Sequence, residues 1–241
     1  MILADFSEAE LSRLKDMARI HFGYGAWTAP IWFVGPEEGF GSPNEMRERL
    51  LAWNGEALDN CLEFHERMPC HRWHRDKEIQ KTWARLIRLL LVYRGLKHDT
   101  EDIRHYQTHH WGQEESECVI ELSGLPAPNL QTGRQLLAKI GICEADWKQI
   151  LDDRIQFLKT KMEQSRTLRV IVLYGLNANA KKYWEKFLGR PIKELEILRC
   201  KGILITLAAG PTSPKGSPYA YWDALAMRLR AANERSSLTD G

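Results

Sequence analysis

The chain has 241 residues, with 34 Lys and Arg against 32 Asp and Glu, so its formal net charge is +2. This near balance does not by itself indicate a nucleic-acid partner, so attraction to phosphate depends on how the charges are distributed. The hydrophobic fraction of 44% and the charged fraction of 27% exclude a disordered or fibrous chain. No apolar run approaches the roughly 20 residues of a membrane helix, and the N-terminus does not resemble a signal peptide. These features predict a cytoplasmic protein without a membrane partner.

Five cysteines are scattered along the chain without a CxxC pair, at positions 61, 70, 118, 143 and 200. Their odd number and their spacing predict reduced thiols rather than a disulfide framework or an iron–sulfur cluster. Cys70, His71 and His74 lie close together in the sequence, but no fourth ligand stands at a spacing recognised for zinc. We therefore expect neither a metal nor another cofactor.

Helical and strand-like patterns alternate along the chain. Residues 7–20 predict a helix, since Ser7 and Glu10 have the spacing of a capping box and apolar residues recur at helical intervals. The first strand-like run is 30–35 (PIWFVG), and a strong amphipathic helix at 76–93 ends before Gly95. Beyond it, predicted strands at 118–123, 169–175 and 202–209 alternate with predicted helices at 144–164, 177–188 and 219–230.

The four predicted strands are continuous apolar runs, as in strands that are covered on both faces of a parallel sheet. With the intervening helices they predict one α/β domain, residues 1–241, folded as a three-layer αβα sandwich around a central, mainly parallel four-stranded sheet. The connection at about 42–111 is long for two successive strands and is expected to be a helical insertion. The tail at about 233–241 is expected to fray.

Four loops rich in Gly, Pro or Asn follow the predicted strands. In open α/β sheets, ligands bind beyond the carboxyl ends of the strands, where such loops converge. Glycine lets the backbone approach a ligand closely, and proline holds a rigid shape. The loops are residues 35–41 (GPEEGFG), 123–129 (SGLPAPN), 175–177 (GLN) and 210–218 (GPTSPKGSP).

The first and last of these loops resemble motifs of the uracil-DNA glycosylase superfamily. In that family a short G-x-(D/N/A)-P-type loop follows the first strand, and residues 35–39 (GPEEG) occupy its place here. An H-P-S-P-type loop follows the last strand, as residues 210–214 (GPTSP) do, and Trp222 stands at about the offset of a tryptophan in the single-strand-selective branch. Residues 170–178 also look like the family's strand-glycine-helix segment. The resemblance covers the whole order of elements and implies a DNA glycosylase that flips a base out of the stack.

The resemblance places Glu37 where the family has the residue that positions or activates water, with Glu38 as the second catalytic candidate. Cleavage of an N-glycosidic bond builds positive charge on the sugar, and a nearby carboxylate stabilises that charge while it accepts a proton from water. Outside this family, the same Pro-Glu-Glu-Gly sequence would be interpreted as a solvated acidic turn. No catalytic lysine is placed in these loops, so we expect a monofunctional enzyme that leaves an abasic site.

Two departures from the family pattern bear on which base is removed. Gly210 replaces the histidine that stabilises the departing uracil anion in most relatives, and Glu38 replaces the proline of the first loop. Gly210 also removes the volume of an imidazole, so the site suits a bulky modified base. Glucosylated 5-hydroxymethylcytosine, which some members of the superfamily excise in phage defence, is such a base. Repair of uracil or another deaminated base, and DNA binding without catalysis, are the alternatives.

The base is expected to be recognised at the exit of the second strand. Relatives place an asparagine there, whereas this chain offers Glu121 and Ser123. A carboxylate accepts hydrogen bonds and would favour the exocyclic amine of cytosine over an oxygen of uracil. Glu121 is equally compatible with a strand-end residue that faces solvent or caps a helix. The expected base-binding residues are Phe40, Glu121, Ser123, Asn129 and Gly210.

Basic and aromatic residues alternate in 65–75 (HERMPCHRWHR). Such a patch can track phosphates while an aromatic ring stacks on an unpaired base, although a solvated helix with Trp73 in the core has the same pattern. In relatives the last loop presses on DNA and supplies a wedge behind the flipped base. The expected DNA-binding residues are Arg72, Arg75, Pro211, Thr212, Ser213, Lys215, Ser217 and Tyr219. DNA is the implied partner, no obligate protein partner is evident, and we expect a monomer.

Overall fold

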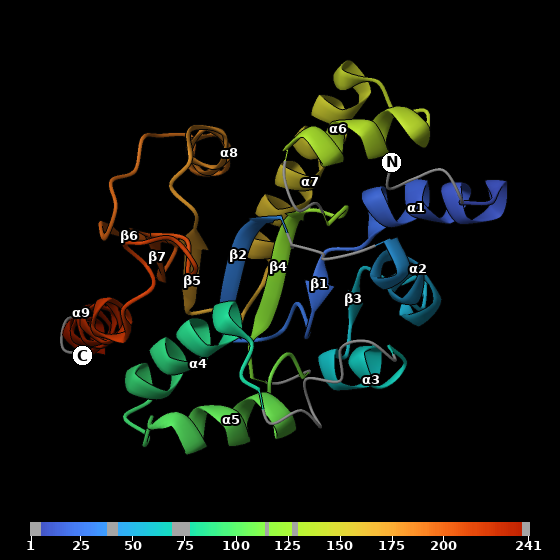
Figure 1. Ribbon diagram of the computed structural model, residues 1–241. Coiled ribbons are helices and arrows are strands. Elements are labelled where there is room, and N and C mark those ends of the chain that lie inside the picture. Colours follow the sequence, from blue (N-terminus) through green and yellow to red (C-terminus); the bar gives the residue numbers. More distant parts are fainter. Residues whose placement is uncertain (1–5, 38–42, 69–77, 114–115, 127–129, 238–241) are drawn as a thin grey trace.

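The computed structural model describes residues 6–37, 43–68, 78–113, 116–126 and 130–237. The described strands are β1 (Gly23–Tyr24), β2 (Ile31–Glu37), β3 (Leu58–Asp59), β4 (Cys118–Ser123), β5 (Val170–Tyr174), β6 (Ile197–Cys200) and β7 (Ile203–Ala208). They form one seven-stranded sheet in the order β3-β1-β4-β2-β5-β7-β6 (Figure 1). Strands β4, β2, β5 and β7 are mutually parallel, whereas β1 pairs antiparallel with β4, and β6 antiparallel with β7.

The four strands predicted from apolar runs are the four central, parallel strands, but the predicted size of the sheet is wrong. The sheet is mixed, because three further strands extend it at both edges. Two of them, β1 and β3, have two residues each, which is too short to produce an apolar run. The third, β6, is an edge strand whose residues are half-buried or exposed, so its sequence does not show the buried pattern.

The helices of the described chain occupy both faces of this sheet. They are α1 (Glu8–Ile20), α2 (Pro43–Ala52), α3 (Cys61–Glu66), α4 (Lys81–Tyr93), α5 (Thr100–His109), α6 (Leu130–Lys139), α7 (Glu144–Gln164), α8 (Ala178–Leu188) and α9 (Tyr219–Ser237). The connection between β2 and β4 therefore contains the short strand β3 as well as helices. Among the helices of the described part, none has both the length and the apolar composition that a bilayer crossing requires.

Capping side chains decide where two of the predicted helices begin. At α1 the predicted capping box is confirmed, since Ser7 Oγ accepts a hydrogen bond from Glu10 N at 3.3 Å and Glu10 Oε2 accepts one from Ser7 N at 2.7 Å. Helix α4 begins later than predicted, because Gln80 Oε1 accepts from Trp83 N at 2.7 Å and caps the helix there. At the other end of the chain, α9 continues to Ser237, beyond residue 233, where fraying was predicted.

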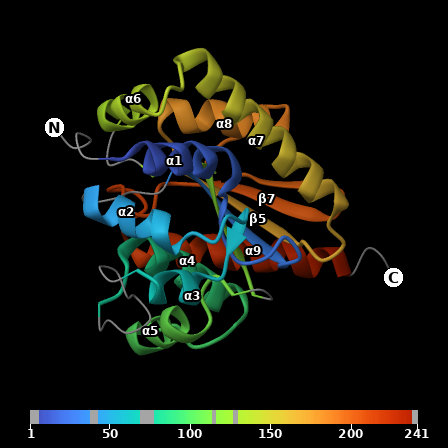
Figure 2. The same ribbon diagram turned by 90° about the vertical axis from the view of Figure 1, so that its right-hand side faces the viewer.

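Helices α7 and α8 lie on one face of the sheet and helices α4 and α9 on the other (Figure 2). An apolar core fills the space between the sheet and each layer of helices. One core contains Trp32, Val34 and Leu173 from the sheet and lies under α7 and α8. The other contains Phe33 and Val172 and lies under α4 and α9, with α1 beside them. Neighbouring residues of β2 thus point into opposite cores, and both faces of the central strands are covered. This explains why those strands are apolar at every position.

A buried arginine joins α1, β4 and α7. Arg154 of α7 is 2% exposed, and its guanidinium donates hydrogen bonds to the carbonyl oxygens of Ala18, Arg19, His21, Glu121 and Leu122, at 2.6 to 3.4 Å. It also lies 3.7 Å from the ring centroid of Phe22. Burial lowers the pKa of Arg154 to about 9. The carbonyls at the end of a helix have no partner within that helix, so Arg154 satisfies the end of α1 and fastens it to the end of β4.

We expect Arg154→Leu to lower the free energy of unfolding by at least about 3 kcal/mol, because several buried carbonyls lose their donor at once. Chemical denaturation monitored by circular dichroism measures this change. Arg166→Leu is the control, since Arg166 is an exposed arginine. Equal stability of the two variants would contradict the role assigned to Arg154.

Candidate active site

The four parallel strands β4, β2, β5 and β7 have their carboxyl ends at the same end of the sheet. Glu37 of β2 pairs with Ser123 of β4, so both strands end side by side. Gly175, which follows β5, donates a backbone hydrogen bond to Ala208 O at 3.1 Å. A Cβ atom at Gly175 would lie 3.4 Å from Pro36 Cδ, and one at Gly210 would lie 4.0 Å from Gly175 Cα. Within the described residues, the end of β2 at Pro36 and the turn after β7 at Gly210 therefore lie on the two sides of Gly175.

A hydrogen bond crosses β2 directly above Gly35. Tyr174 of β5 donates from Oη to Glu121 Oε1 of β4 at 2.8 Å, and β2 lies between these two strands. A Cβ atom at Gly35 would lie 2.3 Å from the Tyr174 ring and 2.5 Å from Glu121 Oε2. Only glycine leaves room for this contact. Glu121 is thus engaged with Tyr174 and is not among the residues that line the cavities described next, and its predicted role in reading the base stays a prediction.

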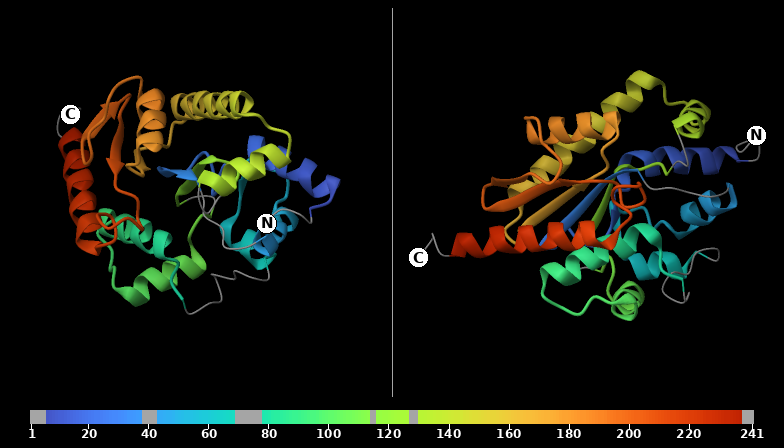
Figure 3. Two further views of the ribbon diagram at one scale, coloured as in Figure 1. Left: turned by 45° about the horizontal axis from the view of Figure 1, so that its top comes forward. Right: turned by 60° about the vertical axis from the view of Figure 1, so that its left-hand side comes forward.

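Residues of α6, α7 and α8 line two adjoining cavities at the carboxyl ends of the strands. These three helices are the yellow to orange ribbons of Figure 3, left. The smaller has a volume of about 280 Å³ and begins at Pro36 and Asn177. The larger has a volume of about 790 Å³ and extends to Arg134 and Glu144. The residues that line both cavities are Ser123, Trp147, Asn179 and Tyr183. Together the cavities have the size and the mixture of aromatic and polar groups that small-molecule sites show.

Of the expected base-binding residues that the structure describes, which are Glu121, Ser123 and Gly210, only Ser123 lines the cavities. Its hydroxyl donates to Leu125 O at 2.8 Å and accepts from Leu125 N at 3.3 Å, so it shapes the turn at the exit of β4. The next residue must be glycine, because a Cβ atom at Gly124 would lie 2.6 Å from Met17 O. Ser123 therefore stands at a fixed position on the cavity wall.

Hydrogen bonds of Ser213 and Trp222 stabilise the loop after β7. Ser213 Oγ donates to Gly210 O at 2.7 Å and accepts from Gly216 N at 3.1 Å. Trp222 Nε1 donates to Gly216 O at 2.6 Å, and a Cβ atom at Gly216 would lie 2.2 Å from Gly210 O. Ser213 and Trp222 thus stabilise the loop itself, and the predicted contact of Ser213 with DNA stays a prediction. Gly210 lies in this loop and not among the residues that line the two cavities.

The remaining residues predicted to bind DNA in this loop have different surroundings. Pro211 is buried and Thr212 is exposed, so Thr212 is the more accessible of the two. Lys215 forms an ion pair with Glu194. The backbone oxygen of Ser217 accepts from Arg85 Nε at 3.2 Å.

Tyr219, another residue predicted to bind DNA, packs against α4. The guanidinium carbons of Arg85 and Arg88 lie 5.2 and 4.8 Å from the centroid of its ring. Arg88 also donates two hydrogen bonds of 2.7 Å to the carboxylate of Asp223. These contacts fix the start of α9 on α4. They also hold Arg85 beside the loop after β7.

Several predicted residues lie outside the described part of the chain. They are Glu38, Phe40, Arg72, Arg75 and Asn129. For Glu37 the backbone is described, as the last residue of β2. Within the described residues, no group of three or more His, Cys, Asp or Glu side chains is placed to hold a metal ion.

The sequence did not indicate the aromatic residues of the cavities. Trp147 lies in α7 and Tyr183 in α8, at half-buried positions that resemble ordinary core positions of amphipathic helices. The lining residues that belonged to predicted loops are Pro36, Ser123, Leu125 and Asn177. Asn177 Oδ1 accepts from Ala180 N at 2.8 Å and caps α8, and Asn177 also lines the smaller cavity.

A buried acid at the other end of the sheet, where the parallel strands begin, has a structural role. Glu117 precedes β4 and accepts hydrogen bonds from Tyr106 Oη at 2.7 Å and Gly112 N at 2.9 Å. Burial raises the pKa of Glu117 to about 7, against the lowering effect of these hydrogen bonds. Because Glu117 stands at the amino end of β4, it is remote from the loops at the carboxyl ends.

The comparisons with known proteins leave the chain without an assigned family. No protein-family model matches it, and no curated protein matches it. The functional interpretation therefore depends on the site itself.

We expect Gly35→Ala to lower the free energy of unfolding by about 2 kcal/mol or more, because a methyl group would collide with Tyr174 and Glu121. Gly210→Ala is the matched control. Its methyl group meets atoms only at ordinary contact distance, so we expect a change below about 1 kcal/mol. Urea denaturation of both variants measures the difference. A similar loss at the two positions would show that the space above Gly35 is not restrictive.

Proposed function

We propose that this chain is a monofunctional DNA glycosylase that flips out a modified base and hydrolyses its N-glycosidic bond, leaving an abasic site. The proposed substrate is a cytosine with a bulky 5-substituent, of which glucosylated 5-hydroxymethylcytosine in phage DNA is the leading example. The observation that supports the proposal most is that the end of β2 at Pro36 and the turn after β7 at Gly210 flank Gly175, beside two adjoining cavities. This arrangement agrees with the resemblance to the uracil-DNA glycosylase superfamily.

In the proposed reaction, the bond between the base nitrogen and C1′ of the sugar breaks, and both electrons leave with the base. The sugar then has oxocarbenium character, which the carboxylate of Glu37 stabilises. Glu37 accepts a proton from water as the water oxygen bonds to C1′, and the departing base takes up a proton. Hydrolysis needs no further reactant, so the products are the free base and an abasic sugar.

The departing base bears negative charge that the missing histidine would otherwise stabilise. The start of α8 lines the smaller cavity with Ala178, Asn179 and Ala180. The N-terminus of a helix stabilises negative charge through its dipole and its unpaired N–H groups. We therefore assign stabilisation of the anion to this end of α8 and to the amide of Asn177.

The larger cavity favours a bulky base over plain uracil. A pyrimidine ring in the smaller cavity could extend a 5-substituent past Trp147 and Tyr183 into the space of about 790 Å³. Trp147 offers an aromatic face for a sugar ring, and Asn179, Arg134 and Glu144 offer hydrogen-bonding groups for hydroxyls. Plain uracil in the smaller cavity would leave the larger cavity unfilled.

The activity is tested by incubating the protein with DNA that contains glucosylated 5-hydroxymethylcytosine, uracil or hypoxanthine, followed by alkali. We expect strand cleavage after alkali with the glucosylated DNA, and at least a hundredfold slower cleavage with Glu37→Gln, because general base catalysis contributes about 10²- to 10⁴-fold. Glu8→Gln, at the exposed start of α1, is the control and should keep the wild-type rate.

The other outcomes distinguish the alternatives. Release of uracil or hypoxanthine in preference to the glucosylated base would identify a repair glycosylase. Tight binding to DNA without release of any base would identify a catalytically silent relative, which the loss of the histidine at position 210 would explain. Cleavage without alkali would contradict the monofunctional mechanism.

We expect Trp147→Ala to lower kcat/KM for the glucosylated substrate by about tenfold or more, since an aromatic stacking contact contributes about 1–3 kcal/mol. Removal of a smaller base should slow less, because that base meets Trp147 only in the smaller cavity and has no 5-substituent to pack on Trp147 in the larger one. Trp27→Ala is the control, since Trp27 is a half-buried tryptophan that packs on Phe157 of α7, outside both cavities. Equal effects of Trp147→Ala on large and small bases would contradict the assignment of the larger cavity.

A further inference from the structure

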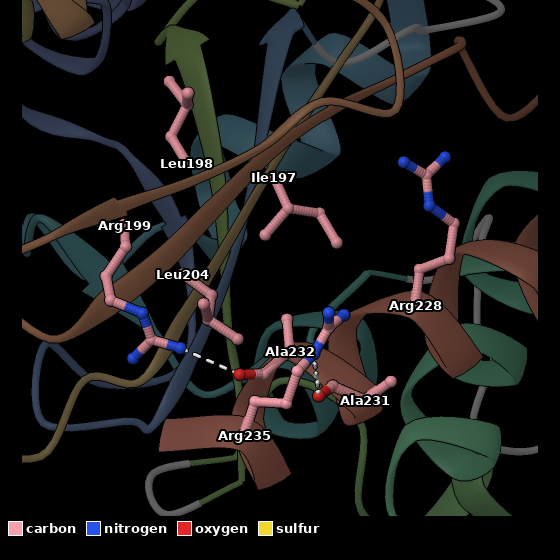
Figure 4. A pocket seen from close by; sticks show the side chains of 8 residues that line it. All are labelled: Ile197, Leu198, Arg199, Leu204, Arg228, Ala231, Ala232 and Arg235. Atoms are coloured by element: carbon pink, nitrogen blue, oxygen red, sulfur yellow. Dashed lines mark hydrogen bonds between the residues drawn. The ribbon is translucent and has the colours of Figure 1, made fainter. Parts of the chain in front are cut away.

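A separate cleft lies between the edge strand β6 and helix α9 (Figure 4). Its volume is about 390 Å³. Leu204, which forms part of its floor, pairs with Val170 and with Arg199, at the beginnings of β7 and β5 and at the end of β6. The candidate active site lies beyond the other ends of β5 and β7. The cleft is therefore a second surface, outside the proposed catalytic machinery.

The spacing of residues along α9 creates this cleft. Arg228, Ala231, Ala232 and Arg235 recur at intervals of three and four residues, which places them on one face of the helix. The two alanines in the middle leave space above the helix, and Ile197 and Leu204 supply apolar surface from the sheet. The result is an apolar floor between two arginines of the same helix.

A third arginine closes the cleft from the side of β6. Arg199 Nη2 donates to Ala232 O at 2.8 Å, and Arg235 Nε donates to Ala231 O at 3.2 Å. Figure 4 shows Arg199 and Arg228 on opposite sides of the cleft. Each guanidinium has five N–H donors, so these bonds to the helix leave most donors of Arg199 and Arg235 for a ligand.

These three arginines form no ion pair with a carboxylate of the described chain. Neighbouring cations do so: Arg230 pairs with Glu234, and Lys201 with Glu163. Arg228 is exposed and makes no hydrogen bond to a described residue. Among the described residues, no acid compensates the positive charge of these arginines, and such a concentration of charge attracts anions.

We propose that the cleft between β6 and α9 binds a nucleotide, with its phosphate on Arg228 and Arg235 and its base over the apolar floor. Guanidinium groups bind phosphate oxygens in a bidentate manner and also stack on flat rings. The cleft has room for one ring system and its phosphate, and its floor is apolar. A free nucleotide and a nucleotide within a DNA strand have the same chemistry, so either could be the source.

Binding is tested with unmodified probes, so the result does not depend on base excision. Isothermal titration calorimetry with dAMP, deoxyadenosine and inorganic phosphate measures the free ligand, and fluorescence anisotropy with a labelled single strand of twelve thymidines measures DNA. We expect dAMP or the single strand to bind, with deoxyadenosine and phosphate at least tenfold weaker than dAMP where dAMP binds. Affinity should fall as salt is added.

Two variants of the cleft identify the site. Arg228→Glu should weaken binding at least tenfold, and Ala231→Leu should do the same by filling the floor while all three charges stay. Arg166→Glu, an exposed charge reversal elsewhere, should change affinity less than twofold. If dAMP displaces the single strand, the free nucleotide occupies the site; if only the single strand binds, the site belongs to DNA. No binding of either, equal effects of Arg166→Glu, or equal binding of a poly-glutamate peptide would overturn the proposal.

Discussion

The guanidinium of Arg154 holds together three elements that the chain supplies from distant places. It donates to the end of α1 and to the end of β4, and it belongs to α7. Its partners are backbone carbonyls. Arg154 therefore fixes the end of β4 against the end of α1 without a specific pair of side chains. The exit of β4 then turns between α1 and α7, where Gly124 passes so close to Met17 O that no side chain fits. The wall of both cavities, including Ser123, depends on this junction.

Close packing at a glycine also determines the contacts of β2, the strand next to β4. Gly35 has no side chain, so Tyr174 and Glu121 meet above it. Gly175 then lies close to both Pro36, at the end of β2, and Gly210, after β7. Each of these glycines removes atoms where two segments must touch, and the residues that remain at the edge are polar or aromatic. This concentration of loops at the carboxyl ends is the physical basis of the proposed glycosylase site.

Charge is distributed differently on the two surfaces that we consider functional. The cavities combine one arginine, Arg134, with one acid, Glu144, and with neutral polar groups, which suits a sugar or a base. The cleft at β6 and α9 has three arginines and no acid along its walls, which suits phosphate. A net charge of +2 would not have indicated this difference, because total charge does not describe local fields.

The sequence by itself determined the central strands, the capping box of α1 and the helices α1, α4, α7, α8 and α9, because these depend on local hydrophobic period and on residues within one turn. It also placed the carboxyl ends of the four parallel strands at one end of the sheet, whereas helix α6 was not predicted. The short and exposed strands at the sheet edges, the engagement of Glu121 with Tyr174, and the cavity lining by Trp147 were decided by tertiary structure alone. These features arise from contacts between residues far apart in the chain, and no local pattern encodes such contacts.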